Sequence, residues 1–309
     1  MTPEPRLPRS LFSVKYIFPV LLALIFGLGL GLRFVGLSAP MLDFHPTRQL
    51  FDAIRARGIY YQTLPDAPAW QRDLSTRQLE NLATIEPPVL EHLAVFFYRY
   101  LGEQTAIPRA FSVMFWAVGG IFLFLLACSL TGSSPAAAAA LAFYMFLPYA
   151  FHASRAFQPD PLMVMLIIIF WWAIEHWGRD PSWKWTLVAG LSGGLALFVK
   201  FPAAFFVIGG GLGAIFAYPG LRKALKFPQT WVLALLGILP AAIYLYYGLY
   251  VERFLRHQFE SRFYPEMLLT ATFYLRWFLK VDLIMSMLWL ALAASTWQPG
   301  PAKARHRLH

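Results

Sequence analysis

The chain has 309 residues, of which 58% are hydrophobic and 14% charged, and its formal net charge is +10. This composition excludes an ordinary soluble domain, and with a single cysteine, Cys128, no disulfide within the chain is possible. The basic residues lack the basic and aromatic groove pattern of nucleic-acid-binding proteins, so we predict an integral membrane protein with no nucleic-acid partner.

Apolar runs long enough to span a membrane recur along the whole chain. The first covers 16–32, follows a basic N-terminus and is predicted as an uncleaved helix. The later runs cover 109–130, 135–151, 160–177, 184–218, 229–250 and 268–296. The run over 184–218 is longer than the roughly 20 residues of one span, and Lys200 and Pro202 lie at its middle, so we predict two helices joined there. The fold class is therefore all-α, a bundle of about eight transmembrane helices.

The basic residues fix the orientation of this bundle. With eight spans, the basic clusters of both termini and of two loops fall on one side, which is the cytoplasmic side by the positive-inside rule. These clusters are Arg6, Arg9 and Lys15; Arg179 and Lys184; Arg222, Lys223 and Lys226; and Lys303, Arg305 and Arg307. We predict a transmembrane module over 1–296, a basic cytoplasmic tail over 297–309, and a bacterial inner membrane as the location.

The polar segment over 37–108 becomes a long first loop on the outer face. Within it, residues 47–61 read as an amphipathic helix in the membrane interface, with Leu50 on its apolar side, Asp52 and Arg55 on its polar side, and Gly58 at its end. A second helix is predicted over 90–100, after paired prolines. The intervening stretch over 63–81 is predicted as a loop with one short polar helix.

Three acidic clusters fall on this outer face, and in two of them the acid stands beside proline. Asp43 opens the motif Asp-Phe-His-Pro-Thr-Arg-Gln, which also contains His45 and Pro46. Glu86 precedes two prolines, and Asp160 stands between two prolines at the start of a later span. Loops placed at random would scatter acids over both faces, so this coincidence predicts a polar site at the outer membrane surface.

The order and spacing of these motifs resemble the GT-C glycosyltransferases. The closest branch is glycosyltransferase family 39, which includes protein O-mannosyltransferases and lipid A aminoarabinose transferases. Asp43 matches the family's catalytic first-loop Asp, Glu86 and Asp160 match its later loop acids, and Lys200 matches its helix-hairpin Lys. The resemblance covers about 10–250. Family members usually carry further helices after this region, and often a soluble domain, so we expect this chain to be C-terminally short.

The resemblance implies transfer of a sugar, with inversion, from a polyprenyl-phosphate donor to an unidentified acceptor hydroxyl or amine. We hypothesise that Asp43 accepts the acceptor's proton, with Glu86 and Asp160 as further catalytic residues. Cationic side chains are needed for the donor's phosphate. The planar guanidinium of Arg and the ammonium of Lys both bind phosphate. The candidates are Arg48, Arg155 and Lys200.

Plain structural roles stay open for each candidate. Asp43 is also suited to cap the helix that follows it. Asp160 is open to three further roles: a ligand of Mg²⁺ or Mn²⁺, an ion pair with Arg155, or a partner of backbone donors at a helix start. His45 suits a hydrogen-bonding role better than a zinc site, because no second His stands at metal spacing. Arg109, at the start of a span, is interpreted as a border residue.

A second class of function also stays open, a polytopic transporter or flippase-like protein whose charged groups line a path across the membrane. Such a protein places ionisable residues near mid-membrane in several helices and often has repeated halves. Here the ionisable groups crowd one surface and no internal repeat is found, which favours an enzyme at the interface. A catalytically inactive scaffold shares the same fold.

Overall fold

The computed structural model describes residues 14–256, 260 and 264–285. The described residues are predominantly helical and contain no strand, which confirms an all-α membrane protein. Contacts divide the chain into a unit over 1–258 and a second unit over 259–309. The second unit contains the short 3-10 helix η2 (Pro265–Leu269) and α14 (Ala271–Met285).

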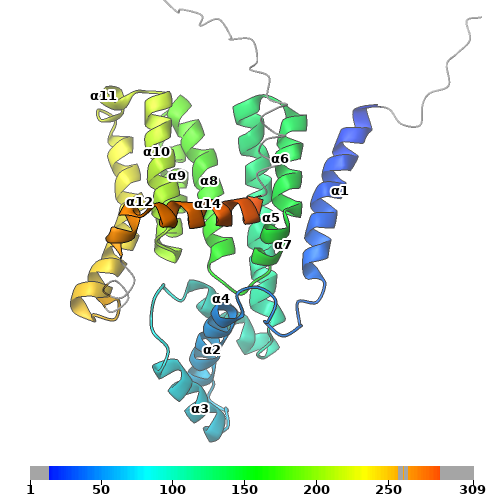
Figure 1. Cartoon of the computed structure of the whole chain (residues 1–309), viewed down its shortest axis with the longest axis vertical. Helices are drawn as coiled ribbons and strands as arrows, with labels where there is room; N and C mark the ends of the chain where they lie inside the picture. Colours follow the sequence, from blue (N-terminus) through cyan, green and yellow to red (C-terminus); the bar gives the residue numbers. More distant parts are fainter. Residues whose placement is uncertain (1–13, 257–259, 261–263, 286–309) are drawn as a thin grey trace, which may run out of the picture. The chain divides into compact units, whose positions relative to one another are not determined.

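The first unit begins with one helix, α1 (Val14–Phe34), followed by an outer group of three and then the helices of the bundle (Figure 1). The outer group is α2 (Pro46–Thr63), α3 (Ala69–Glu80) and α4 (Val89–Leu101). The bundle helices are α5 (Ala106–Thr131), α6 (Ser134–Phe146), α7 (Pro148–Ala153), α8 (Asp160–Arg179), α9 (Trp183–Val199), α10 (Ala203–Ala217), α11 (Leu221–Ala224), α12 (Pro228–Tyr246) and the π-helical turn η1 (Tyr247–Val251).

Four described helices are long and apolar enough to cross a membrane. They lie in α1, α5, α8 and the combined α12 and η1. Three shorter apolar helices, α6, α9 and α10, stand among them. The expected last span over 268–296 overlaps η2 and α14 and then leaves the described residues, as does the whole tail over 297–309. The count of about eight spans therefore stays a prediction.

The predicted break at Lys200 is present. Lys200 is the C-cap of α9, Pro202 is the N-cap of α10, and the two helices form a hairpin. A further break interrupts the predicted run over 135–151, where α6 ends and Pro148 begins α7. Proline removes the backbone donor that would continue the preceding helix.

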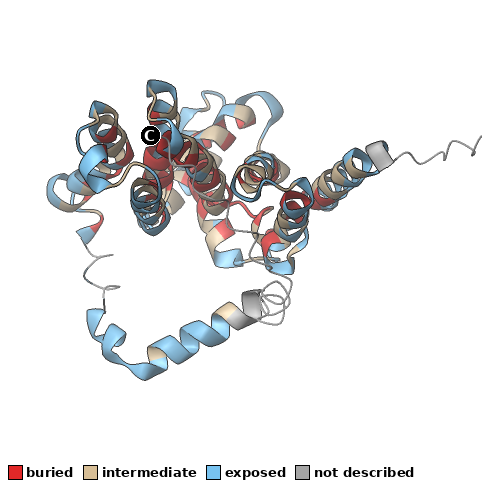
Figure 2. Ribbon diagram, turned by 90° about the horizontal axis from the view of Figure 1, so that it is seen from above, coloured by how far each residue is buried: buried red, intermediate tan, exposed pale blue. Residues whose placement is uncertain are grey.

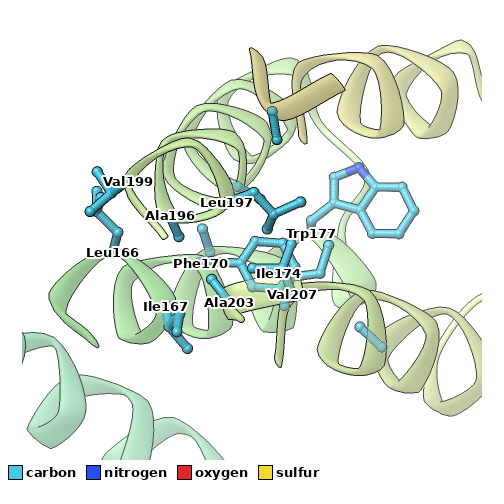
Figure 3. Packing of buried hydrophobic residues seen from close by; sticks show 14 residues of the cluster. Leu166, Ile167, Phe170, Ile174, Trp177, Ala196, Leu197, Val199, Ala203 and Val207 are labelled. Atoms are coloured by element: carbon cyan, nitrogen blue, oxygen red, sulfur yellow. The ribbon is translucent and has the colours of Figure 1, made fainter. Parts of the chain in front are cut away.

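Helices α8, α9, α10 and α12 pack around the largest apolar cluster (Figure 3). Phe170 of α8 lies at its middle, Trp177 of α8 lies at one side, and the cluster includes small residues such as Ala196 of α9 and Ala203 of α10. In Figure 2 the buried residues of this unit gather between the helices, and outward-facing positions are exposed. Exposed apolar side chains are what a bilayer requires of the outer surface of a bundle.

The outer group confirms the predicted helices and corrects two details. Gly58 does not end α2, because its missing side chain makes room for α3: a Cβ there would lie 2.7 Å from Cβ of Leu79. The predicted polar side of α2 is not its solvent side. Asp52 and Arg55 are buried, whereas Leu50 is 43% exposed. The buried positions follow a helical spacing that faces α3 and α4, so charged residues are enclosed there.

Candidate functional site

Asp43 lies in the segment between α1 and α2 and is held by two side chains. Its Oδ2 accepts a hydrogen bond from Nη2 of Arg109 at 2.5 Å, and its Oδ1 accepts one from Nε2 of Gln49 at 3.1 Å. Burial raises the pKa of Asp43, but the Gln49 hydrogen bond and the charge of Arg109 outweigh it, and the pKa lies below its ordinary value. The carboxylate is therefore ionised at neutral pH.

Arg109 is the residue that the sequence interpretation missed. It lies in the first turn of α5, is fully buried, and donates to the carbonyl oxygens of Leu37, Ala39 and Arg155 as well as to Asp43. It therefore joins the segment after α1 to the segment before α8. A basic residue at the border of a span is usually a lipid-facing one, and nothing local in the sequence distinguishes this buried case.

Asp43 does not cap α2. The N-cap is His45, whose backbone has the left-handed values φ 44° and ψ 60°, and Pro46 is the first helical residue. A side chain in this region costs about 1–2 kcal/mol, which neighbouring contacts must offset. His45 packs against the ring of Phe44 at 4.4 Å between centroids, and Gln49 Oε1 accepts a hydrogen bond from the backbone N–H of Phe157 at 3.0 Å.

Asp160 forms an ion pair with Lys200, not with Arg155. Nζ of Lys200 lies 2.9 and 2.8 Å from the two carboxylate oxygens of Asp160, the first residue of α8. Arg155 instead donates from Nη2 to the carbonyl oxygen of Val35 at 2.6 Å. The break between α9 and α10 thus places a cation beside the N-terminal end of α8.

Arg48 of α2 forms a very short ion pair with Glu86. Its Nε also lies 3.5 Å from Oδ2 of Asp52, one turn further along the helix. Burial lowers the pKa of Arg48, but the charges of Asp52 and Glu86 when these acids are ionised, with the hydrogen bond to Glu86, outweigh it and raise the pKa. Glu86, which precedes two prolines, therefore has a charged partner in α2.

These groups meet around a cavity of about 360 Å³. The polar residues of its lining are His45, Arg48, Gln158, Asp160 and Lys200. The aromatic and aliphatic residues of its lining come from α5, α7, α8 and the first motif, among them Phe44, Trp116, Tyr149 and Val164. Glu86 reaches the cavity through Arg48, and Asp43 directly precedes two of the lining residues. Arg155 does not line the cavity.

The expected metal site at Asp160 lacks companions within the described residues. No group of three or more His, Cys, Asp or Glu side chains is arranged there to hold a metal ion. Both oxygens of Asp160 contact the ammonium of Lys200, so a divalent cation would have to displace it.

Comparison with known proteins identifies one family. The family model described as dolichyl-phosphate-mannose-protein mannosyltransferase matches residues 85–247, more than half of the chain. The matched region begins just before Glu86, contains Asp160 and Lys200, and follows the Asp43 motif. No curated protein and no solved structure gives a significant match.

Proposed function

Because the chain belongs to the dolichyl-phosphate-mannose-protein mannosyltransferase family of membrane glycosyltransferases, we propose that it takes its sugar from a polyprenyl-phosphate donor. The acceptor is a hydroxyl or amine, and transfer takes place on the extracytoplasmic face. We place the protein in a bacterial inner membrane with both termini in the cytoplasm, which is the orientation that the positive-inside rule favours.

The mixed lining of the cavity is the observation that carries this proposal. A lipid-phosphate sugar needs an apolar surface for its lipid and cations for its phosphate. The lining includes both kinds of group, the aromatic side chains of Trp116 and Tyr149 and the cations Arg48 and Lys200. Lys200 pairs with Asp160, and Arg48 pairs with Glu86 and lies near Asp52, so an arriving phosphate competes with carboxyl groups for cations that are already oriented.

In the proposed reaction the bond between the anomeric carbon and the phosphate oxygen breaks, and a bond to the acceptor atom forms on the opposite face. Polyprenyl phosphate leaves, and its charge is stabilised by Lys200 and Arg48. The acceptor's proton passes to Asp43. The ionised carboxylate of Asp43 is held by Arg109 and Gln49 and is 31% exposed, which suits a base that is fixed in place.

The positions of buried charges favour this proposal over a transporter. Within the described spans, the buried charged side chains are Arg33 of α1, Arg109 of α5 and Glu175 of α8. Each lies within four residues of a helix end. A path for a charged substrate would need such groups near the middle of several helices.

The test is release of polyprenyl phosphate from a panel of polyprenyl-phosphate sugars, in membranes that contain the parent chain or its Asp43→Asn variant. We expect release by the parent and a loss of about 10²–10⁴-fold in the variant, the usual contribution of a positioned base. Asp66→Asn, at an exposed position of the outer loop, is the matched control for loss of an acid. Equal release by parent and Asp43→Asn would remove Asp43 from its role, and no release from any donor would contradict the proposed function.

A further inference from the structure

A second charged cluster lies behind the cavity, between α2, α4 and the segment that joins α3 to α4. It contains the acids Asp52, Glu86 and Glu91 and the bases Arg48 and Arg55. Asp52 is 1% exposed, and Arg55 and Glu91 are buried too. With every group ionised, the cluster holds one more negative than positive charge, and an unbalanced buried charge is costly.

Arg55 is occupied by other partners. It donates to the carbonyl oxygen of Ala83 at 2.7 Å and to that of Glu86 at 3.4 Å, and its Nη1 lies 3.6 Å from Oε1 of Glu91. From α12, the hydroxyl of Tyr244 reaches the same segment at the carbonyl oxygen of Ile85. Arg48 is therefore the cation to which Asp52 lies closest.

Arg48 and Asp52 lie close together, but no hydrogen bond joins them. Nε of Arg48 and both carboxylate oxygens of Asp52 are buried, and none of the three has a hydrogen-bond partner within the described part of the chain. The donor and the nearer acceptor are 3.5 Å apart. Buried polar atoms are almost always paired, and an ionised carboxylate beside a guanidinium would close this gap. The excess of one acid in this buried cluster, together with the open contact between Arg48 and Asp52, fits a carboxyl group that carries a proton.

We propose that Asp52 is a positioning residue for Arg48: while it is protonated, Arg48 stays directed to the cavity and available to the donor's phosphate. When Asp52 loses its proton to solvent, the guanidinium is drawn back to the new carboxylate and phosphate binding weakens. This inference rests on the proposed function, because it assumes that the cavity receives a phosphate.

The surroundings of Asp52 decide where this change occurs. Burial and the charge of Glu91 raise the pKa of Asp52, Arg48 and Arg55 oppose them, Glu86 adds to the rise, and the result is about 8. Asp52 is thus mostly neutral at pH 7 and ionised well above pH 8. Removal of the Glu91 charge should move the transition to lower pH, because that charge opposes ionisation of Asp52.

The first measurement needs no substrate. Infrared difference spectra of the full chain in lipid nanodiscs, recorded as the pH is raised from about 7 to about 9.5, report loss of a protonated carboxyl group. We expect a carboxylic C=O band that disappears with a midpoint near pH 8 in the parent, is absent from Asp52→Asn, and disappears at lower pH in Glu91→Gln. A spectrum in which the parent shows no such band would overturn the proposal, whatever the protein's function.

The second measurement is binding of farnesyl phosphate, a short lipid-phosphate probe, to the same samples. Phosphate monoesters lose their second proton with a pKa near 6, so the probe is mostly dianionic throughout this range. We expect binding by the parent to weaken roughly tenfold between about pH 7 and about pH 9.5, and binding by Asp52→Asn to lose this dependence. The same pH dependence in both proteins would overturn the role of Asp52 alone. Absence of binding to any sample at any pH would contradict the lipid-phosphate donor and, with it, this role.

Discussion

Lys200 and Asp160 are 40 residues apart in sequence, yet the ammonium of one lies within hydrogen-bond distance of both carboxylate oxygens of the other. The pair joins the break between α9 and α10 to the first residue of α8, and both side chains line the cavity. The side chains are 23% and 34% exposed. Ion pairs with this access to solvent contribute about 1 kcal/mol or less to folding, so stability alone does not explain the pair.

Lys200→Met should therefore separate binding from folding. We expect a loss of transfer of about 10²-fold or more, because a charge that stabilises the leaving phosphate is removed, with little change in the temperature of unfolding. Initial rates of polyprenyl phosphate release and thermal unfolding in detergent measure the two effects. Lys226→Met, at an exposed position before α12, is the control. A loss of activity that only follows a loss of folded protein would show that Lys200 is structural.

Arg109→Met should be strongly destabilising. It leaves the partly buried Asp43 without its cation and three carbonyl oxygens without their donor. Loss of one partner from a buried pair costs about 3–5 kcal/mol. Arg109→Lys keeps the charge but loses the several donor nitrogens of the guanidinium, so we expect an intermediate loss of stability. In chemical unfolding at neutral pH, we expect the free energy of unfolding to fall from the parent to Arg109→Lys and again to Arg109→Met. Equal stability of all three would contradict the role of Arg109 in joining the segment after α1 to the segment before α8.

The Arg109 variants should also change how stability and transfer rate depend on pH. The pKa of Asp43 is lowered in the folded protein, so its interactions stabilise the fold above the unfolded pKa and are lost as pH falls through the folded value. The stability difference between parent and Arg109→Met should shrink in acid. The acid limb of the transfer rate should move to higher pH in Arg109→Lys, where the contact with Asp43 is weaker. A pH–rate profile identical to that of the parent would contradict Asp43 as the titrating base.

Gly194 is a packing position where α9 meets α12. A Cβ there would lie 2.1 Å from the carbonyl oxygen of Leu236, and backbone cannot move aside as a side chain can. We expect Gly194→Ala to destabilise the protein by about 1–3 kcal/mol, the usual cost of overpacking. Gly213→Ala in α10, where nothing lies within 4 Å, should stabilise by up to about 1 kcal/mol through helix propensity. Thermal unfolding of the two variants tests the contrast, and equal shifts would contradict it.

Asp52→Asn should become relatively more stable as pH rises. The folded pKa of Asp52 is raised to about 8 from 3.8, so the folded parent binds more protons than the unfolded chain between these values and loses stability across that window. The side-chain amide of Asp52→Asn does not titrate, so the variant does not lose stability in this window. The advantage of Asp52→Asn in unfolding temperature should therefore grow from about pH 4 to about pH 8 and then level off. A constant difference across this range would mean that Asp52 is ionised in the folded protein throughout.

Several elements were predictable because their causes are local. The hairpin at Lys200 follows from a charge and a proline in the middle of an overlong apolar run, and both are read within a few residues. Helix α4 begins after Pro87 and Pro88 as expected, and α2 lies within two residues of its predicted bounds. The errors came where contacts between distant segments determine the structure. Gly58 lies within a helix and not at its end, and the side chain of Leu79 packs against it.

The sequence by itself determined the membrane class, the positions of the described apolar helices and the candidate acids, because burial of apolar segments and exclusion of charge act on short windows of chain. Only the tertiary structure decided which charges meet. It paired Asp43 with Arg109, Glu86 with Arg48 and Asp160 with Lys200, and it enclosed Asp52. The energy of an ion pair depends on distance and on the surrounding dielectric, and for residues that are 38 to 66 positions apart both are set by how the helices pack.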